Sequence, residues 1–205
     1  MKTVTGFLAR VDVDTTSQRT KKAVFLDRDG VINVEKGYVH RIEEFELLPG
    51  VPRAIRLLKD AGFLVIVVTN QSGIARGYYP LDAVHRLHRH LDEELAAFGA
   101  CIDAYYICPH HPEHGIGDLK VNCSCRKPLP GMLEQAAADF GIHLSESYMI
   151  GDKPTDVEAG LAAGCRPLFL GTVCGAREGG IPEGIPVFPG LLDAVRAIVE
   201  PDKPQ

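Results

Sequence analysis

Two acidic residues separated by one position directly follow a short apolar run. Residues 23–26 are all apolar, and Asp27, Arg28, Asp29 and Gly30 come next. Such a run is typical of a buried parallel strand, and glycine permits a sharp turn after it. Carboxylates this close repel one another unless a cation neutralises them. The pattern suits a site for a hard divalent ion such as Mg²⁺ or a carboxylate that attacks a phosphoryl group, and an acidic turn after a core strand is the structural alternative.

Two other predicted strands also end in polar residues. An apolar run over 63–68 ends at Thr69, and another over 148–150 is followed after one glycine by Asp152. The carboxyl ends of parallel strands lie at the same edge of a sheet, which is where ligands bind in open α/β folds. We therefore expect these side chains to meet Asp27.

Together with Lys127, these residues fit the hydrolysis of a phosphate monoester. Asp27, Asp152 and a backbone carbonyl near Asp29 can hold Mg²⁺. Thr69 can donate a hydrogen bond to a phosphoryl oxygen, and Lys127 supplies a positive charge. Asp27 is then the candidate nucleophile and Asp29 the candidate acid and base. The structural alternatives are a strand-end cap for Thr69 and a surface position for Lys127.

The composition indicates one globular domain. The chain has 205 residues, 45% of them hydrophobic, and a formal net charge of −5. This length allows one domain with a full core. The negative charge argues against a nucleic-acid partner, and no apolar run is long enough to span a membrane. No secretory signal is recognisable at the N-terminus, so we expect a cytoplasmic protein, and we expect it to be a monomer.

Predicted helices alternate with the predicted strands. Apolar residues recur at helical spacing over 51–61, 84–98, 132–140, 155–163 and 191–199. Further apolar runs predict strands over 104–107, 167–170 and 187–188. The alternation predicts an α/β fold with a doubly wound parallel sheet and helices on both faces. Only a loop and a helix separate Asp29 from Phe63, so we expect no inserted cap domain.

The rest of the chain carries weaker signals. We divide it into an extension over 1–20, with a short strand at Phe7-Leu8, a domain over 21–200 and a tail over 201–205. Residues 171–186 are rich in glycine and are expected to form a loop. Helix 84–98 carries three histidines without acidic or cysteine partners at ligand spacing, and we expect them on its solvated face. They are His85, His88 and His90.

Residues 108–125 contain metal-ligand side chains at metal-ligand spacing. A Cys-x-His pair is followed twelve residues later by a Cys-x-Cys pair. Three thiolates and one imidazole make a closed tetrahedral set that suits a structural Zn²⁺. The favoured ligands are Cys108, His110, Cys123 and Cys125. His111 and His114 compete for the fourth position, and the alternative is a loop of metal-free cysteines.

Zinc would order a long loop that leads directly to the phosphate site. Nearly twenty residues without regular structure are unusual in a compact domain. Fixing them would present Arg126 and Lys127 to the substrate. Arg126 could then form a bidentate pair with a second anionic group on the substrate.

The motif order resembles the haloacid dehalogenase (HAD) superfamily of phosphohydrolases over about residues 22–170. The motifs are D-x-D-G, then strand-Thr-Asn, then Lys, then G-D-x-x-x-D. The resemblance implies that Asp27 is the nucleophile, Asp29 the acid and base, Thr69 a phosphate ligand, Lys127 the stabilising cation and Asp152 a magnesium ligand. Asp156 is expected to order the metal site from outside or to open a helix.

Longer motifs are similar to one family within that superfamily, the heptose-bisphosphate phosphatases. They include F-L-D-R-D-G-V-I-N, V-V-T-N-Q-S-G-I-A-R-G and C-x-C-R-K-P-x-P-G-M. The resemblance implies a capless enzyme that removes the C7 phosphate of the sugar for ADP- or GDP-heptose synthesis. It implies substrate contacts by Arg28, Glu35, Lys36, Gly37, Tyr38, Thr69, Asn70, Gln71, Ser72, Arg126, Lys127 and Lys153. It implies Mg²⁺ contacts by Asp27, Asp29, Asp152 and Lys153.

Other functions remain open at this point. Histidinol-phosphate phosphatases share the acids and the zinc loop, but Arg126 would repel a cationic amine. A polynucleotide 3′-phosphatase would need a basic, aromatic stripe that the sequence lacks. The non-enzymatic alternatives are a phospho-receiver domain, which is shorter and lacks an acid equivalent to Asp29, and a zinc-ordered binding module.

Overall fold

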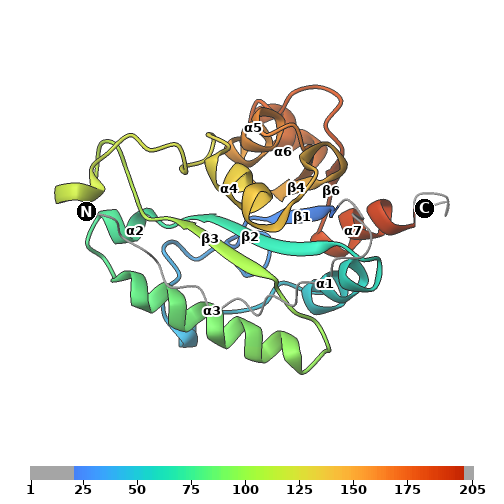
Figure 1. Ribbon diagram of the computed structural model, residues 1–205, viewed down its shortest axis with the longest axis horizontal. Coiled ribbons are helices and arrows are strands. Elements are labelled where there is room, and N and C mark those ends of the chain that lie inside the picture. Colours follow the sequence, from blue (N-terminus) through green and yellow to red (C-terminus); the bar gives the residue numbers. More distant parts are fainter. Residues whose placement is uncertain (1–20, 201–205) are drawn as a thin grey trace.

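The fold is built on a single parallel sheet with helices on both faces (Figure 1). A computed structural model of the chain describes residues 21–200, so the expected strand at Phe7-Leu8 and the tail lie outside the described residues. Six strands follow one another in the order β3-β2-β1-β4-β5-β6, and each neighbouring pair is parallel. They are β1 (Ala23–Leu26), β2 (Leu64–Asn70), β3 (Ala104–Cys108), β4 (Tyr148–Gly151), β5 (Arg166–Leu170) and β6 (Val187–Phe188).

The helices form two layers that cover the sheet. One face packs against α1 (Val51–Asp60), α3 (Leu81–Ala96) and α7 (Leu191–Val199). The other face packs against α4 (Gly131–Phe140) and α5 (Pro154–Ala162), which lie above the sheet in Figure 1. The doubly wound α/β architecture is therefore confirmed. Within residues 21–200, no domain is inserted between β1 and β2, which are joined by a loop, a short 3-10 turn (Ile42–Glu44) and α1.

Strand β1 is apolar throughout because both of its faces are buried. Val24 and Leu26 belong to the core under α1 and α7, whereas Ala23 and Phe25 belong to the core under α4 and α5. All four side chains are fully buried. Alternating side chains point to opposite faces, so a strand covered on both sides must be apolar at every position.

The chain reverses its direction of winding beside β1. After β1 it proceeds outward to β2 and β3, and then crosses back to begin β4 on the other side of β1. The carboxyl ends of β1 and β4 therefore flank a topological switch point, where open α/β sheets bind their ligands. The sequence immediately after these two strands holds Asp27 and Asp152.

Strand β2 is longer than expected. It continues through Thr69 and Asn70, which pair with Ile107 and Cys108 of β3. The predicted end at residue 68 was wrong because the polar side chains suggested a loop, whereas their backbone still belongs to the ladder. Thr69 thus projects from a strand, which fixes its position more firmly than a loop would.

The sequence did not predict two short helices that the structure contains. Helix α2 (Ser72–Ala75) follows β2, and α6 (Val173–Glu178) lies within the segment predicted to be a loop over 171–186. Thr172 caps α6 by accepting a hydrogen bond from the backbone N–H of Gly175 at 3.0 Å. A single helical turn carries too few residues to show a periodic pattern.

The expectation that His88 lies on the solvated face of α3 was wrong. Its side chain is buried and its ring stacks on Tyr105 of β3, with 4.2 Å between ring centroids. Burial lowers the pKa of His88 well below its ordinary value, so the ring is neutral. His85 and His90 are partly exposed, as expected of that face. Within residues 21–200, no helix is both long and apolar enough to cross a membrane.

The start of β1 is anchored by a buried serine, which gives a test of the fold. The hydroxyl of Ser147 accepts a hydrogen bond from Ala23 N at 3.0 Å and donates one to His143 O at 2.7 Å. Replacing Ser147 with Ala should lower the free energy of unfolding by about 1–3 kcal/mol, because the buried N–H of Ala23 loses its acceptor. Urea unfolding should show a lower midpoint with an unchanged m-value. The exposed Ser145→Ala control should change stability by less than about 0.5 kcal/mol, and equal effects would contradict the anchor.

Candidate active site

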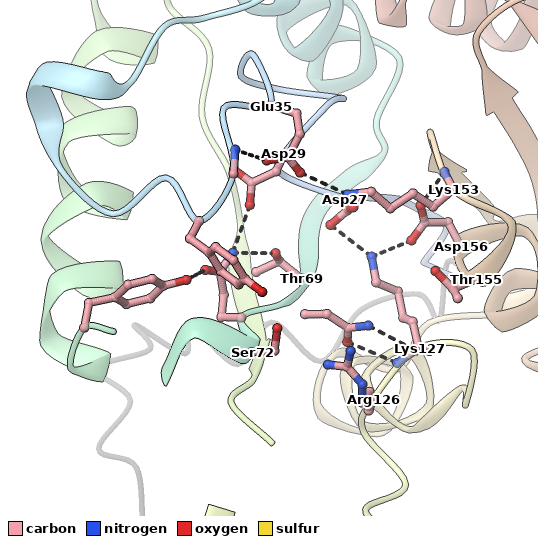
Figure 2. A pocket seen from close by; sticks show the side chains of 15 residues that line it. Asp27, Asp29, Glu35, Thr69, Ser72, Arg126, Lys127, Lys153, Thr155 and Asp156 are labelled. Atoms are coloured by element: carbon pink, nitrogen blue, oxygen red, sulfur yellow. Dashed lines mark hydrogen bonds and ion pairs between the residues drawn. The ribbon is translucent and has the colours of Figure 1, made fainter. Parts of the chain in front are cut away.

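A pocket of about 450 Å³ opens at the carboxyl ends of β1 and β2 (Figure 2). It is lined by Asp27, Asp29, Glu35, Gly37, Tyr38, Thr69, Asn70, Gln71, Ser72, Tyr79, Arg126, Lys127, Lys153, Thr155 and Asp156. The pocket therefore gathers most of the residues singled out in the sequence. Its walls come from four separate parts of the chain: the segment after β1, the end of β2 with α2, the segment around Arg126, and the start of α5.

Asp27 and Lys127 form the centre of the pocket. The ammonium of Lys127 lies 3.0 Å from Asp27 Oδ1 and 2.6 Å from Asp156 Oδ1, as the dashed lines in Figure 2 show. Asp27 is 5% exposed and Lys127 is 2% exposed. Burial disfavours the charge on Lys127, but the carboxylates of Asp156 and Asp27 outweigh it and raise the lysine pKa above its ordinary value. Lys127 is thus a buried, permanent cation rather than a surface lysine.

The backbone around Lys127 is held by Asn70. The Asn70 amide donates to Lys127 O at 3.0 Å and its oxygen accepts from Lys127 N at 3.1 Å. Both ends of the amide are therefore committed to the backbone. Asn70 lines the pocket as expected, but its visible task is to attach the Lys127 segment to the end of β2.

Asp29 is held by three neighbouring side chains. The Arg28 guanidinium donates to both of its oxygens at 2.8 Å, and Asn33 donates to Oδ1 at 3.0 Å. The amide of Gln71 donates to Asp29 Oδ2 at 3.1 Å and to Thr69 Oγ1 at 3.0 Å. Asp29 and Thr69, which come from different strands, are thereby linked through one amide.

Arg28 lies elsewhere than expected. Its side chain is fully buried, is not part of the pocket lining, and donates to Asp29 and to Val39 O. The structure gives this side chain no place in the pocket lining, so its expected contact with substrate stays a prediction. The turn after β1 brings Arg28 back over Asp29, which a two-residue sequence pattern does not reveal.

Asp152 has a carboxylate that is only weakly compensated. Its Oδ1 atom is buried and accepts no hydrogen bond from the described residues, and Lys153 Nζ lies 3.9 Å away. Burial raises the pKa of Asp152 to about 7, against the opposing effect of Lys153. Asp152 lines a neighbouring cavity of about 650 Å³ that also includes Gly30.

The backbone at Gly30 brings β1 close to Asp152. Gly30 has φ +88°, and a Cβ atom there would lie 2.1 Å from Asp152 Oδ2. Asp27, Asp152 and Asp156 each offer an oxygen within 4.8 Å of the others. This donor set and the Asp152 oxygen that lacks a hydrogen bond fit a hard divalent cation, which would offset the carboxylate charge.

Asp156 interacts both with the Lys127 ammonium and with the backbone at the start of α5. In addition to its ion pair with Lys127, its Oδ2 atom accepts a hydrogen bond from Lys153 N at 3.0 Å. The Lys153 carbonyl in turn accepts one from Asp156 N. Asp156 is 1% exposed. It therefore orders the start of α5 and holds Lys127, while it also offers an oxygen to the group of three carboxylates, so its expected role outside the metal site stays a prediction.

The rim of the pocket joins the loop after β1 to Lys153. Glu35 accepts a hydrogen bond from Gly37 N at 2.8 Å and lies 3.1 Å from Lys153 Nζ. Tyr38 follows with φ 56°, an uncommon conformation for a side chain-bearing residue. Lys36 is the exception in this loop, because it pairs with Glu46 at 2.8 Å and does not line the pocket.

The four favoured zinc ligands converge beside the pocket. Cys123 Sγ lies 3.6 Å from Cys108 Sγ and 3.3 Å from Cys125 Sγ. His110 Nδ1 lies 3.9 Å from Cys108 Sγ and 3.5 Å from Cys125 Sγ. A tetrahedral zinc with Zn–S bonds of about 2.3 Å separates its sulfur ligands by about 3.8 Å. The donor set and its spacing therefore fit Zn²⁺.

The competing histidines have other partners. His111 Nδ1 accepts hydrogen bonds from Glu113 N at 3.2 Å and His114 N at 3.1 Å. Among the residues described, the Cys/His cluster contains His110 and neither of the other two. Arg126 donates to His110 O at 3.2 Å, which ties the pocket residue to the cluster.

Sequence reasoning assigned no role to three residues at the site. Tyr79 donates to Gln71 Oε1 at 2.9 Å and its ring stacks on His40. Asn33 donates to Asp29, and Thr155 lines the pocket at the start of α5. The four-residue spacing between Asp29 and Asn33 was the available signal for a side chain-capped turn, whereas Tyr79 is brought to the site by tertiary packing alone.

Comparisons with known proteins agree with this geometry. A family model described as HAD-hydrolase-like matches residues 124–179. The D-glycero-beta-D-manno-heptose-1,7-bisphosphate 7-phosphatase of Yersinia pestis is 49% identical over 141 residues, covering 69% of this chain and 75% of the relative. The D-glycero-alpha-D-manno-heptose-1,7-bisphosphate 7-phosphatase of Burkholderia mallei is 50% identical over 149 residues, covering 73% and 79%.

A solved structure extends the likeness to three dimensions. The D,D-heptose 1,7-bisphosphate phosphatase from B. bronchiseptica, complexed with magnesium and phosphate, superposes with a TM-score of 0.78 at 35% identity. The match covers 88% of this chain and 99% of that chain. The chain therefore belongs to the family of D-glycero-D-manno-heptose-1,7-bisphosphate 7-phosphatases within the HAD-type hydrolases.

Proposed function

We propose that this chain is a magnesium-dependent phosphatase that hydrolyses the C7 phosphate of D-glycero-D-manno-heptose 1,7-bisphosphate. The observation that carries the proposal is the arrangement of a buried carboxylate, a buried cation and a second carboxylate around one pocket. They belong to Asp27, Lys127 and Asp29. Named relatives at 49% and 50% identity support the sugar as substrate.

In the first step, Asp27 attacks phosphorus and the bond to the sugar oxygen breaks. Lys127 lies against Asp27 and can offset the charge that builds on the phosphoryl oxygens. The Thr69 hydroxyl, which accepts from Gln71, remains free to donate to one of those oxygens. Asp29 gives its proton to the leaving sugar oxygen. The products are the free sugar hydroxyl and an aspartyl-phosphate on Asp27.

In the second step, water hydrolyses the aspartyl-phosphate. Asp29 takes a proton from the water as the new oxygen–phosphorus bond forms and the bond to Asp27 breaks. Inorganic phosphate leaves, and both carboxyl groups return to their starting states. Because one residue serves as acid and then as base, its carboxyl must stay within reach of both oxygens.

Asp27 and Asp152 would hold the magnesium ion, with a backbone carbonyl near Asp29. When bound, the ion neutralises part of the phosphate charge. Lys153 carries its ammonium toward the same region, 3.9 Å from Asp152. We also propose a structural zinc held by Cys108, His110, Cys123 and Cys125, whose spacing supports it. We further propose a cytoplasmic monomer that acts on a small phosphorylated sugar.

Arg126 supports a substrate with two phosphates. It lies in the pocket lining beside Lys127, and its guanidinium can pair with a second anionic group in a bidentate manner. Histidinol phosphate carries an amine instead, which a guanidinium repels. The charge at this rim position therefore favours the bisphosphate.

Replacing Asp27 with Asn tests the nucleophile. Turnover of heptose 1,7-bisphosphate should fall at least about 1,000-fold, because an amide does not form the aspartyl-phosphate. Phosphate release should be measured together with trapping of labelled phosphoenzyme. The same substitution at Asp139, an exposed residue of α4, is the control and should leave turnover within about twofold of wild type. Phosphoenzyme formation by the Asp27→Asn variant would refute the assignment.

Replacing Arg126 with Met tests the second phosphate. The KM for heptose 1,7-bisphosphate should rise about 10- to 100-fold, because a charge-assisted hydrogen bond worth about 1.5–3 kcal/mol is lost. The KM for heptose 7-phosphate should change less than about threefold, since that ester lacks the second phosphate. Steady-state kinetics on both C1 anomers would measure this, with exposed Arg89→Met as the matched control.

Two results would count against that reading of Arg126. An equal loss on the bisphosphate and the monophosphate would show a general defect in the pocket. A higher kcat/KM of the wild type on histidinol phosphate than on either heptose anomer would overturn the sugar assignment itself.

Replacing Cys125 with Ser tests the zinc cluster. The wild type should contain one zinc per chain by elemental analysis, and the variant less than half of that, because a hydroxyl is a poor zinc ligand. Activity should fall at least about tenfold, since Arg126 and Lys127 follow Cys125 directly. Cys174→Ser, an exposed cysteine outside the cluster, should change neither quantity. Full zinc and full activity in Cys125→Ser would contradict a metal-ordered loop.

A further inference from the structure

A fully buried arginine, Arg28, stands in the sequence between the two acids that follow β1. Arg28 is 0% exposed and takes no part in the pocket lining. Removing a guanidinium from water costs several kcal/mol unless its charge is matched by a well-placed partner. The two proton transfers and the nucleophilic attack described above do not require Arg28 to touch substrate. Its burial at this position therefore needs another explanation.

The polar contacts of Arg28 are concentrated on one carboxylate. Its Nη2 atom donates to Asp29 Oδ1 and Oδ2, both at 2.8 Å, and its Nε atom donates to Asp29 Oδ1 at 3.2 Å. Nη2 also donates to Val39 O at 2.8 Å, which attaches the guanidinium to the loop after β1. Within residues 21–200, Asp29 is the only acid within ion-pair distance of Arg28.

The surroundings of Arg28 offer no competing acid. Its charge acts on the side chains of Tyr79, His88 and Tyr105. His88 and Tyr105 stack on each other, and burial together with the Arg28 charge keeps the His88 ring neutral. The guanidinium therefore has an anionic partner in Asp29 and otherwise acts on neutral rings. Its strongest interaction is directed toward the pocket.

Two other side chains donate to Asp29, but each does so only once. Asn33 donates to Oδ1 at 3.0 Å and Gln71 to Oδ2 at 3.1 Å. Among the described residues, Arg28 provides three of the five donor contacts to Asp29 and the only positive charge, with one Nη2 hydrogen shared by both oxygens because the other is donated to Val39 O. A planar fork that contacts both oxygens also fixes the rotation of the carboxylate, which single donors do not.

We infer that Arg28 is a positioning residue that aims the carboxyl of Asp29 at the sugar oxygen and at the attacking water. This inference rests on the proposed function and assigns the residue between the two acids a role that involves no contact with substrate. Arg28 acts through Asp29, so its loss should harm proton transfer and spare the attack by Asp27. General acid and base catalysis by a placed side chain contributes about 10²- to 10⁴-fold.

The chemistry of the leaving group separates these two effects. An alkoxide of the sugar needs a proton from Asp29 as its bond to phosphorus breaks. The p-nitrophenolate ion is stable enough to leave without that proton, and Asp27 still forms the same aspartyl-phosphate. Single-turnover release of p-nitrophenolate from p-nitrophenyl phosphate therefore reports the attack alone, whereas cleavage of heptose 1,7-bisphosphate reports attack and proton transfer together.

The test is Arg28→Met, which keeps the length of the side chain and removes its charge and donors. Single-turnover cleavage of heptose 1,7-bisphosphate should fall about 100-fold. Release of p-nitrophenolate should change less than about threefold. Lys59→Met is the control, because Lys59 makes a partly buried ion pair with Asp103 away from the pocket. It should leave the ratio of the two rates unchanged.

A double substitution checks that Arg28 acts through Asp29. In an Asp29→Ala background, adding Arg28→Met should change the cleavage of heptose 1,7-bisphosphate less than about twofold, since the carboxyl that Arg28 orients is gone. Additive losses would show a general structural role and overturn the inference. If Arg28→Met is unfolded by circular dichroism, Arg28→Lys carries the same comparison, because an ammonium keeps the charge but not the planar fork.

The remaining outcomes separate this inference from the proposed function. A folded Arg28 variant that loses both rates equally would overturn the positioning role and leave the phosphatase assignment standing. A wild type that cleaves neither heptose 1,7-bisphosphate nor p-nitrophenyl phosphate would overturn both.

Discussion

The structure depends on one buried ammonium balanced by two carboxylates. Lys127 contacts Asp27, which follows β1, and Asp156, which begins α5. Its own segment is attached to β2 through Asn70. Each of these groups would be costly to bury alone, and removing one partner of such a set leaves an uncompensated charge that costs about 3–5 kcal/mol. The same interactions that make the charges tolerable also bring four distant segments to one point.

The sheet makes this arrangement possible. The switch point between β1 and β4 places Asp27 and Asp152 side by side, and Gly30 allows the turn after β1 to approach Asp152 closely. The resulting crowd of carboxylates is unfavourable without cations. Lys127 supplies one positive charge from the protein, and the Asp152 oxygen that accepts no hydrogen bond from the described residues leaves a place where a divalent ion is favourable. Stability and the capacity to bind a phosphate dianion therefore have the same electrostatic origin.

The sequence predicted the features that depend on local pattern. Apolar runs located all six strands and their order of alternation with the five long helices, and the polar residues after β1, β2 and β4 indicated the edge of the sheet that bears the pocket. The Cys/His cluster followed from spacing, and among the described residues it contains His110 but not His111 or His114. Features that depend on packing between distant segments were missed. His88 is buried because β3 places Tyr105 against it, and α6 is a short helix of six residues capped by Thr172.

Arg28 shows most clearly where a pattern fails. Adjacent side chains in a strand point to opposite faces, so Arg28 and Asp29 would not meet if β1 simply continued. They meet because the chain turns at this point, with Arg28 O accepting hydrogen bonds from Ile32 N and Asn33 N. The turn makes Arg28 a bidentate partner of Asp29, the next residue in the sequence, and the sequence pattern alone does not show this contact.

The order of residues at the end of the cysteine loop has a consequence for how the protein fails. Cys125, Arg126 and Lys127 are consecutive, so a member of the Cys/His cluster, the rim guanidinium and the central ammonium share one short stretch of backbone. Disorder in that stretch would withdraw selectivity and catalytic charge at the same time. A molecule damaged in this stretch would therefore lose its activity and would not become a less selective phosphatase.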